Sequence, residues 1–529
     1  MKNPDRPING LNALGFTLLS AVLCSPSLPA APLTASEARG KQLYLTGAGA
    51  SGKPVKALVG PESTELSGTD VPCAGCHGED GHGRPEGGIV PTDITFEYLT
   101  LAYGHSHDNG RKHAAFTDDT LIAAITGGID PAGNRLDSAM PRYALSAGDG
   151  ADLIAYLKRL SADADPGLSE SAIRLGTLLP MSGPLAGMGQ AMKDMLSAYF
   201  DEINARGGIY NRKIRLEVAE FDGSAGSTMK NVRHLLETEP VFALIAPFAG
   251  GLEQEILLLS ESLGVPQIGP YTLFPEENPA RSRTAFYLLP GLKNEARAMV
   301  DYAVDALQLK NAAVMVVCPE NSNIQGAAEA VEKQSRARGL GAVAKVTYSS
   351  QRSQAQAFAA ELDRQPPEAI FFFGADDELR MLLESAERLK QKPYVFISSS
   401  LTNSNGINEA FHGRVFLSLP SLPRNRAGAD EFFRLIERNH LPTHHLTAQA
   451  ATYGAARLLT EGLQRSGNEL SRKKLINTLE TLYQFDAGLM LPLSYGSNRH
   501  IGSAAATIVS AFRDGRYSSP PIGRSHKKK

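Results

Sequence analysis

Two cysteines and a histidine form the most specific pattern of reactive side chains in the sequence. Cys73 and Cys76 are separated by two residues, and His77 follows the second cysteine directly. This spacing is typical of a c-type haem attachment site, where each thiol bonds a haem vinyl group and the imidazole binds the iron. A redox cysteine pair or half of a zinc site would share the pattern, but a zinc site needs further ligands. Because Cys24 and Cys318 are isolated, we expect one covalent haem c.

A sixth iron ligand is expected from a loop further along the chain. Met140 precedes Pro141 in a polar stretch that leads into an apolar helical pattern. A thioether opposite an imidazole raises the reduction potential, which suits an electron carrier. Four histidines are the alternative axial ligands: His82, His105, His107 and His113. The last three would also suit a metal cluster, although such a polar run is more typical of a surface loop.

Helices must position these ligands. Apolar residues at helical spacing predict three of them, over residues 37–44, 117–126 and 146–160. With the C-x-x-C-H motif and the M-P-x-Y sequence that starts at Met140, residues 36–162 resemble a class I cytochrome c domain. The resemblance implies a small all-α domain with haem bonded to the two cysteines. It also implies that His77 is the proximal ligand of the iron and Met140 the distal one.

The size and composition of the chain fit an exported multidomain protein. It has 529 residues and a formal net charge of −3. This charge gives no sign of the basic surface that nucleic-acid-binding proteins carry. A basic start, an apolar run and small residues near Ala30 and Ala31 are typical of a secretory signal peptide. We therefore expect residues 1–31 to be cleaved off near Ala30 or Ala31 and the mature protein to be periplasmic. Residues 519–529 are expected to be a disordered tail.

A second module follows a short linker. Residues 163–172 are polar and contain Pro166 and Gly167, which is typical of a domain boundary. Over residues 173–518, short apolar runs then alternate with helical patterns. Such alternation indicates parallel sheets covered by helices on both faces, and the length exceeds what one sheet needs. We therefore predict a multidomain protein in which the all-α domain precedes a two-lobed α/β module.

Loops after the predicted strands carry a second resemblance. Residues 179–184, 246–251 and 269–272 resemble the corresponding loops of type I periplasmic solute-binding proteins of the branched-chain amino acid receptor group. The resemblance implies hinge closure of two lobes around a small solute. Lobe one would comprise about residues 173–290 and 421–490, and lobe two about residues 291–420 and 491–518. The implied solute contacts are Ser182, Phe248, Ala249, Gly250, Tyr271 and Thr272 from lobe one and Asn323, Asp376 and Ser400 from lobe two.

Two departures from the receptor pattern affect the expected solute. Amino acid receptors of this group usually place a hydroxyl residue where this chain has Gly250 and Gly251. The acid that would meet an amino group is also not evident in lobe two. A solute other than an amino acid is therefore at least as well supported as leucine, isoleucine or valine.

These observations favour an electron carrier over an enzyme, because no hydrolase, P-loop or zinc-protease motif is present. The leading hypothesis is a periplasmic monohaem cytochrome c fused to a module that recognises a small solute or docks a partner. The redox partner would be an exported dehydrogenase or another cytochrome. The alternative is a receptor that delivers solute to an ABC permease or acts as a sensor and carries an accessory haem.

Overall fold

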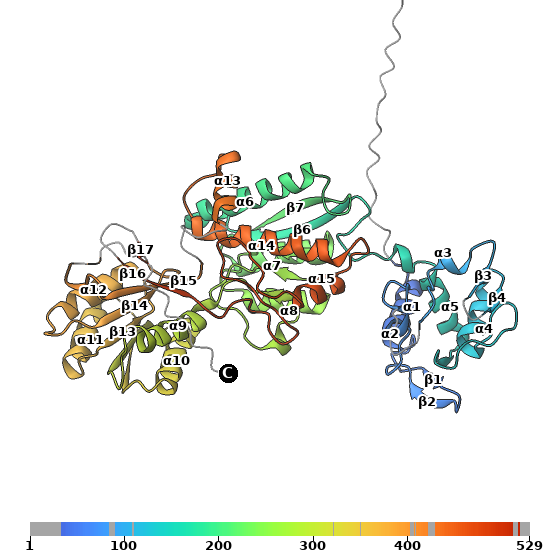
Figure 1. Cartoon of the computed structure of the whole chain (residues 1–529), viewed down its shortest axis with the longest axis horizontal. Helices are drawn as coiled ribbons and strands as arrows, with labels where there is room; N and C mark the ends of the chain where they lie inside the picture. The colour runs from blue at the N-terminus through green and yellow to red at the C-terminus, as the bar shows by residue number, and fades with distance from the viewer. Residues whose placement is uncertain are drawn as a thin grey trace, which may run out of the picture. The chain divides into compact units, whose positions relative to one another are not determined.

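The computed structural model describes residues 33–83, 90–107, 110–320, 322–349, 351–402, 407, 409–421, 429–511 and 517–518. The chain divides into two compact units, Met1–Asp163 and Ala164–Lys529 (Figure 1). The predicted signal peptide and tail lie outside the described residues, as does Cys24. No helix in the described part of the chain is both long and apolar enough to span a bilayer.

The first unit is built on two crossing helices. Its helical elements are α1 (Ala35–Thr46), α2 (Cys73–His77), α3 (Phe96–Leu99), α4 (Asp118–Gly127), α5 (Ala147–Leu157) and the turn η1 (Leu160–Ala162). Helix α1 packs against α5 at Gly40, where a Cβ atom would lie only 2.0 Å from the backbone oxygen of Asp152. The Arg39 guanidinium fixes this crossing with bonds of 2.6 and 2.8 Å to the Asp152 carboxylate. The predicted N-cap Thr117 accepts a bond from the Thr120 amide, so α4 begins where the sequence indicated.

The first unit also contains short strands. The prediction of an all-α domain did not include them. Strand β1 (Lys56–Val59) lies between β2 (Thr64–Ser67) and β5 (Arg142–Ala144) in an antiparallel sheet. Strands β3 (His105–Ser106) and β4 (Lys112–His113) form a separate hairpin. Strands of two to four residues are too short for an alternating pattern to stand out in the sequence.

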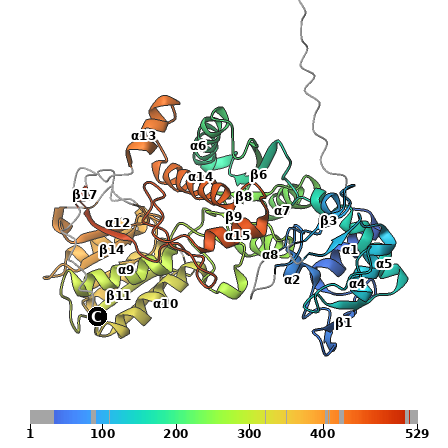
Figure 2. The ribbon, with the colours of Figure 1, turned by 45° about the vertical axis from the view of Figure 1, so that its right-hand side comes forward.

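Lobe one of the second unit is a five-stranded sheet in the order β10-β9-β8-β6-β7, with every pairing parallel. Its strands are β6 (Ala172–Leu179), β7 (Lys213–Glu220), β8 (Ala243–Ile245), β9 (Gln267–Ile268) and β10 (Ala285–Phe286). One core contains residues of α6 (Ala186–Ala205), α13 (Ala429–Arg438), α14 (Leu446–Ser466) and α15 (Arg472–Glu480). Figure 2 shows α14 beside α6. A second core contains residues of α7 (Ala225–Arg233), η3 (His234–Thr238) and α8 (Glu253–Leu263).

Lobe two is a seven-stranded sheet in the order β12-β11-β13-β14-β15-β16-β17. Its strands are β11 (Val314–Pro319), β12 (Val343–Tyr348), β13 (Ala369–Phe372), β14 (Tyr394–Ser398), β15 (Val415–Leu419), β16 (Thr507–Ala511) and β17 (Tyr517–Ser518). Alternate residues of the buried strands face two separate cores. One core includes residues of α9 (Gly291–Asp305) and α10 (Ser322–Ala337), and the other includes residues of α11 (Gln351–Arg364) and α12 (Asp376–Glu387). Helices therefore cover both faces, as the alternating sequence pattern predicts.

The chain passes between the two sheets three times: after β10, after β15 and before β16. Leu493 and Tyr495, which fall within the range predicted for lobe two, instead lie in the core of lobe one. The Tyr495 hydroxyl donates to the Tyr287 carbonyl, and Ile501 forms a parallel bridge with Tyr287. The last passage therefore comes after Ile501. An irregular segment of this kind has no period in the sequence that would reveal which lobe it joins.

Candidate functional site

The predicted haem attachment residues lie on the short helix α2. Cys73 and Cys76 are one turn apart, so a single face of the helix carries both thiols. Gly78 ends the helix at φ 77°, a conformation that favours glycine, and its amide donates to the Ala74 carbonyl. The buried Tyr44 of α1 donates from its hydroxyl to the Gly78 carbonyl over 2.6 Å. The helix that carries the motif is therefore anchored to the core of the unit.

A backbone contact orients His77. Its Nδ1 lies 3.0 Å from the Thr92 carbonyl oxygen, and a carbonyl can only accept a hydrogen bond. Nδ1 therefore carries the proton, and Nε2 keeps the lone pair that a metal would bind. Burial lowers the pKa of His77, which favours the neutral imidazole.

The segment before the first cysteine is tied to the loop that carries Met140. Tyr143 on β5 donates from its hydroxyl to the Val71 carbonyl, two residues before Cys73. Burial raises the pKa of the Cys73 thiol to about 11 and outweighs a hydrogen bond with Tyr143. This thiol is therefore protonated at neutral pH. Redox-active cysteine pairs use a thiolate whose pKa is lowered, and the environment of Cys73 does the opposite.

Arg142 holds the turn that ends at Met140. Its guanidinium donates to three backbone carbonyls, those of Leu136 and Asp137 at 3.0 Å each and that of Met140 itself. Met140 is half-buried in this turn. Arg142 thus ties the backbone of this turn together through its guanidinium.

Together these side chains fit a covalently bound haem. Two thiols on one helical turn match the two vinyl groups, and an imidazole with a free Nε2 follows directly. Met140, the predicted second ligand, lies in a turn whose backbone is held by Arg142. The sequence motif did not reveal the supporting contacts of Tyr44, Thr92 and Arg142, because such contacts depend on the folded backbone.

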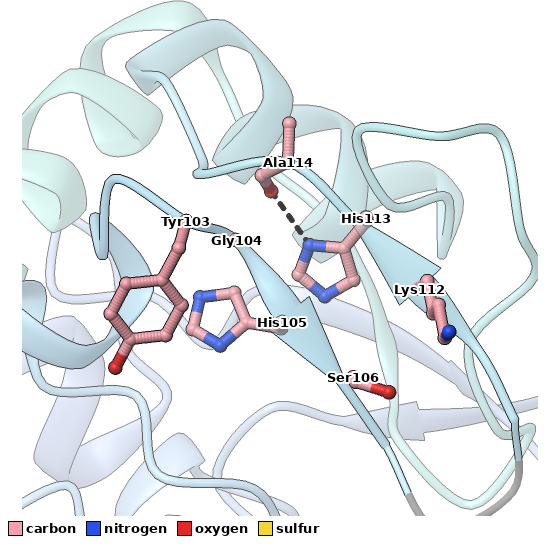
Figure 3. Close-up of a pocket in the computed structure, with 7 residues that line it drawn as sticks. All are labelled: Tyr103, Gly104, His105, Ser106, Lys112, His113 and Ala114. Carbon is pink, nitrogen blue, oxygen red and sulfur yellow. Dashed lines mark hydrogen bonds between the residues drawn. The ribbon is translucent and has the colours of Figure 1, made fainter.

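The histidine alternatives to Met140 form a separate cluster on the β3–β4 hairpin. Figure 3 shows the imidazoles of His105 and His113 side by side at an open pocket, with ring centroids 4.9 Å apart. His113 Nε2 also lies 3.0 Å from His107 Nε2. Burial lowers the pKa of both His105 and His107. Among the described residues, no group of three or more His, Cys, Asp or Glu side chains is arranged to hold a metal ion.

The remaining histidine alternative, His82, is paired differently. Its Nδ1 lies 2.8 Å from the Asp93 carboxylate, and its side chain is 44% exposed. The ring nitrogen that faces Asp93 is therefore occupied by a carboxylate. His82 thus has a local partner, like the three histidines of the hairpin.

The predicted lobe-one contacts gather where the parallel strands end. Ser182 follows β6 and is exposed, whereas Phe248 follows β8 and pairs with Tyr271 after β9 in a parallel bridge. Their ring centroids are 6.4 Å apart. Ala249 is buried between Phe248 and the exposed Gly250. Thr272 is buried and donates to the Glu253 carboxylate over 3.1 Å. Carboxyl ends of parallel strands are where ligands bind in open α/β sheets.

The predicted lobe-two contacts lie at the corresponding end of their sheet. Asn323 is exposed in the first turn of α10, and Asp376 is the first residue of α12. The Thr402 hydroxyl donates to Asp376, and the Ser400 hydroxyl lies 3.3 Å from Glu295. The structure therefore places both Asp376 and Ser400 at this end of the sheet, where each contacts a neighbouring polar side chain.

Glu295 is a polar residue that the sequence analysis missed. Its carboxylate is buried in lobe two and accepts bonds from the hydroxyls of Ser398, Ser400 and Ser418. Burial raises the pKa of Glu295 despite these bonds. A signal was present, because this acid stands on the otherwise apolar face of α9 beside Leu292 and Ala296. Glu295 links α9 to the ends of β14 and β15.

Family models match both units. Residues 172–516 match the periplasmic binding protein family. The chain belongs to this family. Residues 65–161 match cytochrome c, so this periplasmic binding protein carries a cytochrome c domain in front of its α/β module. A cytochrome c domain implies covalently bound haem, and both families consist of non-catalytic proteins that suggest an exported, periplasmic location.

Curated relatives belong to the same group. A Leu/Ile/Val-binding protein of Rhizobium johnstonii is 21% identical over 307 residues, which are 57% of this chain and 81% of that protein. A Leu/Ile/Val-binding protein homolog of Brucella melitensis is 23% identical over 304 residues, which are 56% of this chain and 80% of that protein. These relatives support the resemblance that the strand-end loops indicated.

Solved structures show the fold of the second unit. A putative branched-chain amino acid ABC transporter from Silicibacter pomeroyi has a TM-score of 0.57 and 15% identity, over 66% of this chain and 97% of its own. A branched chain amino acid ABC transporter from Thermus thermophilus with bound valine has a TM-score of 0.55 and 15% identity, covering 66% and 96%. A fatty acid ABC transporter substrate-binding protein from Thermomonospora curvata has a TM-score of 0.54 and 17% identity, covering 66% and 91%.

Proposed function

We propose that the protein is a periplasmic monohaem cytochrome c that transfers single electrons and is fused to a module that recognises a small solute or docks a redox partner. The observation that carries this proposal is the presentation of Cys73, Cys76 and His77 on one anchored helix, with His77 Nδ1 held by the Thr92 carbonyl. A haem with histidine and methionine ligands supplies a one-electron couple of raised potential.

The roles of the chain's own residues follow from their contacts. Cys73 and Cys76 would hold the haem covalently, and His77 would bind the iron through Nε2, because the Thr92 carbonyl occupies its Nδ1. Met140 would supply the second side-chain ligand, and Arg142 keeps the Met140 turn in place. If His77 and Met140 both ligate the iron, oxygen or peroxide would find no open site, which favours electron transfer over oxidase or peroxidase chemistry.

The proposed organisation of the chain keeps the boundaries predicted from its sequence. Residues 1–31 form a signal peptide cleaved near Ala30 or Ala31, and residues 36–162 form the cytochrome c domain. A linker over residues 163–172 leads to the solute-binding module at residues 173–518, and residues 519–529 form a tail.

In the second module, the proposed solute contacts come from both sheets. Lobe one contributes the loops after β6, β8 and β9, and lobe two contributes Asn323, Asp376 and Ser400. In the leading proposal, an exported dehydrogenase or another cytochrome exchanges electrons with the haem. The solute-binding module then either senses the solute or provides the surface on which this partner docks.

A second candidate function is a substrate-binding receptor of an ABC importer, or a sensor, with an accessory haem. Its support is that the α/β unit aligns with 100% of the chain of an extracellular ligand-binding receptor from Verminephrobacter eiseniae, at a TM-score of 0.54 and 19% identity. The unit thus includes the whole receptor fold. This alternative requires a permease that recognises both lobes of the closed form.

Stopped-flow spectroscopy of the mature holoprotein tests the proposal. The reduced protein is mixed with an oxidised soluble cytochrome, and the oxidised protein with a reduced exported dehydrogenase. Electron exchange within milliseconds to seconds that is lost in a Cys73→Ala, Cys76→Ala double variant is the expected result. Slow exchange with every partner, together with solute-dependent binding to a permease, would instead support the importer alternative.

A further inference from the structure

Three aromatic side chains meet at the strand ends of lobe one. Phe221 follows β7, Phe248 follows β8 and Tyr271 follows β9, and all three are half-buried. The rings of Phe221 and Phe248 pack edge to face with centroids 5.1 Å apart, and Phe248 lies 6.4 Å from Tyr271. The amides of Phe221 and Phe248 both donate to backbone carbonyls at the end of β6. The backbone therefore holds this aromatic patch, which consists of Phe221, Phe248 and Tyr271, at one edge of the sheet.

Gly250 explains why no hydroxyl residue stands in this loop. A Cβ atom at Gly250 would lie 2.3 Å from the Cζ atom of Phe221, and the backbone there has a φ of 56°. Any larger side chain would push the Phe221 ring out of the aromatic patch and strain the backbone. The absence of a hydroxyl residue at position 250 is therefore linked to Phe221, because the Phe221 ring fills the space that a side chain there would need.

Two nearby hydrogen-bond donors are directed at an acidic side chain. The Thr272 hydroxyl donates to the Glu253 carboxylate over 3.1 Å and accepts from the Phe274 amide over 3.0 Å. The Gly251 amide donates to Glu253 over 3.4 Å. Glu253 is also the first residue of α8, so its charge offsets the positive end of that helix. A carboxylate on a solute would find these donors already engaged by Glu253.

Charge at this edge also opposes an anion. The loops after β6, β7, β8 and β9, taken as residues 180–190, 221–225, 246–253 and 269–277, contain no lysine, arginine or histidine. They contain four acidic residues instead: Asp222, Glu253, Glu276 and Glu277. On balance these loops would disfavour a negatively charged solute, although Glu277 is paired with Arg297 over 2.8 Å and His445 lies beside Gly187.

We propose that lobe one binds an aromatic solute that carries no carboxylate or other anionic group, with its ring packed against Phe221, Phe248 and Tyr271. This inference rests on the proposed function, because it assumes that the second module recognises a small solute. Ring contacts at 4.5–7 Å supply the affinity of such a site. The acidic loops weaken the binding of amino acids through their α-carboxylate and also weaken the binding of aromatic acids.

Isothermal titration calorimetry on the mature holoprotein tests the proposal with five probes: benzyl alcohol, benzylamine, benzoate, phenylalanine and leucine. Binding of benzyl alcohol or benzylamine, with benzoate and both amino acids at least about tenfold weaker, is the expected result. Tighter binding of leucine, phenylalanine or benzoate would overturn this inference while leaving solute recognition intact. Binding of none of the probes would overturn it as well, and solute recognition would then be tested separately with a broader panel of small molecules.

Two variants separate ring packing from charge. Phe248→Leu should weaken benzyl alcohol binding by about three- to tenfold, since an aromatic contact is replaced by an aliphatic one. Phe433→Leu, which changes a half-buried aromatic residue of α13 in the same lobe, should leave binding unchanged. Glu253→Gln removes one negative charge, so the ratio of the benzyl alcohol affinity to the benzoate affinity should fall by about two- to fivefold. Equal effects of the two phenylalanine variants, or an unchanged preference in Glu253→Gln, would contradict the assignment.

Discussion

The turn that presents Met140 offers a direct test of how the iron ligand is positioned. In the Arg142→Ala variant, the carbonyls of Leu136, Asp137 and Met140 lose the donor that they share. Each hydrogen bond contributes about 1 kcal/mol net, so the turn should lose about 3 kcal/mol of conformational stability. Because 1.4 kcal/mol corresponds to a tenfold change, the ordered turn should be disfavoured roughly 100-fold.

Two spectroscopic properties report on this change. The weak red absorption band of a methionine-ligated ferric haem should diminish in Arg142→Ala, and the reduction potential should fall because thioether ligation raises it. Arg142→Lys should show an intermediate effect, since one ammonium group cannot reach three carbonyls as a guanidinium does. The control is Arg135→Ala, because Arg135 lies in the same loop and is exposed.

The reasoning would be refuted if Arg142→Ala kept both the absorption band and the potential of the parent protein. It would also fail if Arg135→Ala changed them equally, since the effect would then come from the loop in general. A loss of the band without a change in thermal stability of the domain would show that Arg142 acts on the ligand turn itself.

Three further predictions concern stability. Gly40→Ala should destabilise the cytochrome unit by about 1–3 kcal/mol in thermal unfolding, because backbone atoms obstruct its Cβ, whereas Gly127→Ala meets no atom within 4 Å and should be neutral or stabilising. The free energy of unfolding of Glu295→Gln should rise relative to that of the parent protein from pH 5 to pH 8. Burial raises the pKa of Glu295, so the parent protein loses stability as this carboxyl group ionises with rising pH. Parallel profiles of unfolding free energy against pH would argue against this. Burial opposes the ionisation of Asp130, but hydrogen bonds, including one from Arg111, hold its pKa at about 2. The stability that ionised Asp130 gives the folded protein should therefore persist above pH 4 and disappear between pH 4 and pH 2. Asp130→Asn should lack this pH-dependent stability.

Much of the cytochrome unit could be predicted from its sequence because its signals are local. The spacing of Cys73, Cys76 and His77 indicates attachment chemistry, and a cap such as Thr117 marks where a helix begins. The contacts that orient those residues could not be predicted. Thr92 and Arg142 act through the geometry of irregular backbone, which has no sequence period.

For the second module, the alternation of strands and helices predicted the fold, and the family match confirms it. The loops after β6, β8 and β9 also lie at one sheet edge, because parallel strands must end together. What escaped prediction depends on side chains far apart in sequence. Glu295 meets serines more than 100 positions away, and Phe221 covers Gly250.

A potentiometric titration of the native, full-length holoprotein, followed by its visible spectrum, tests the central claim most directly. The account predicts one covalent haem with a single one-electron transition, a spectrum of histidine–methionine ligation and loss of that spectrum in Met140→Ala. Two transitions, no covalent haem, or a Met140→Ala protein with the parent spectrum and potential would contradict it.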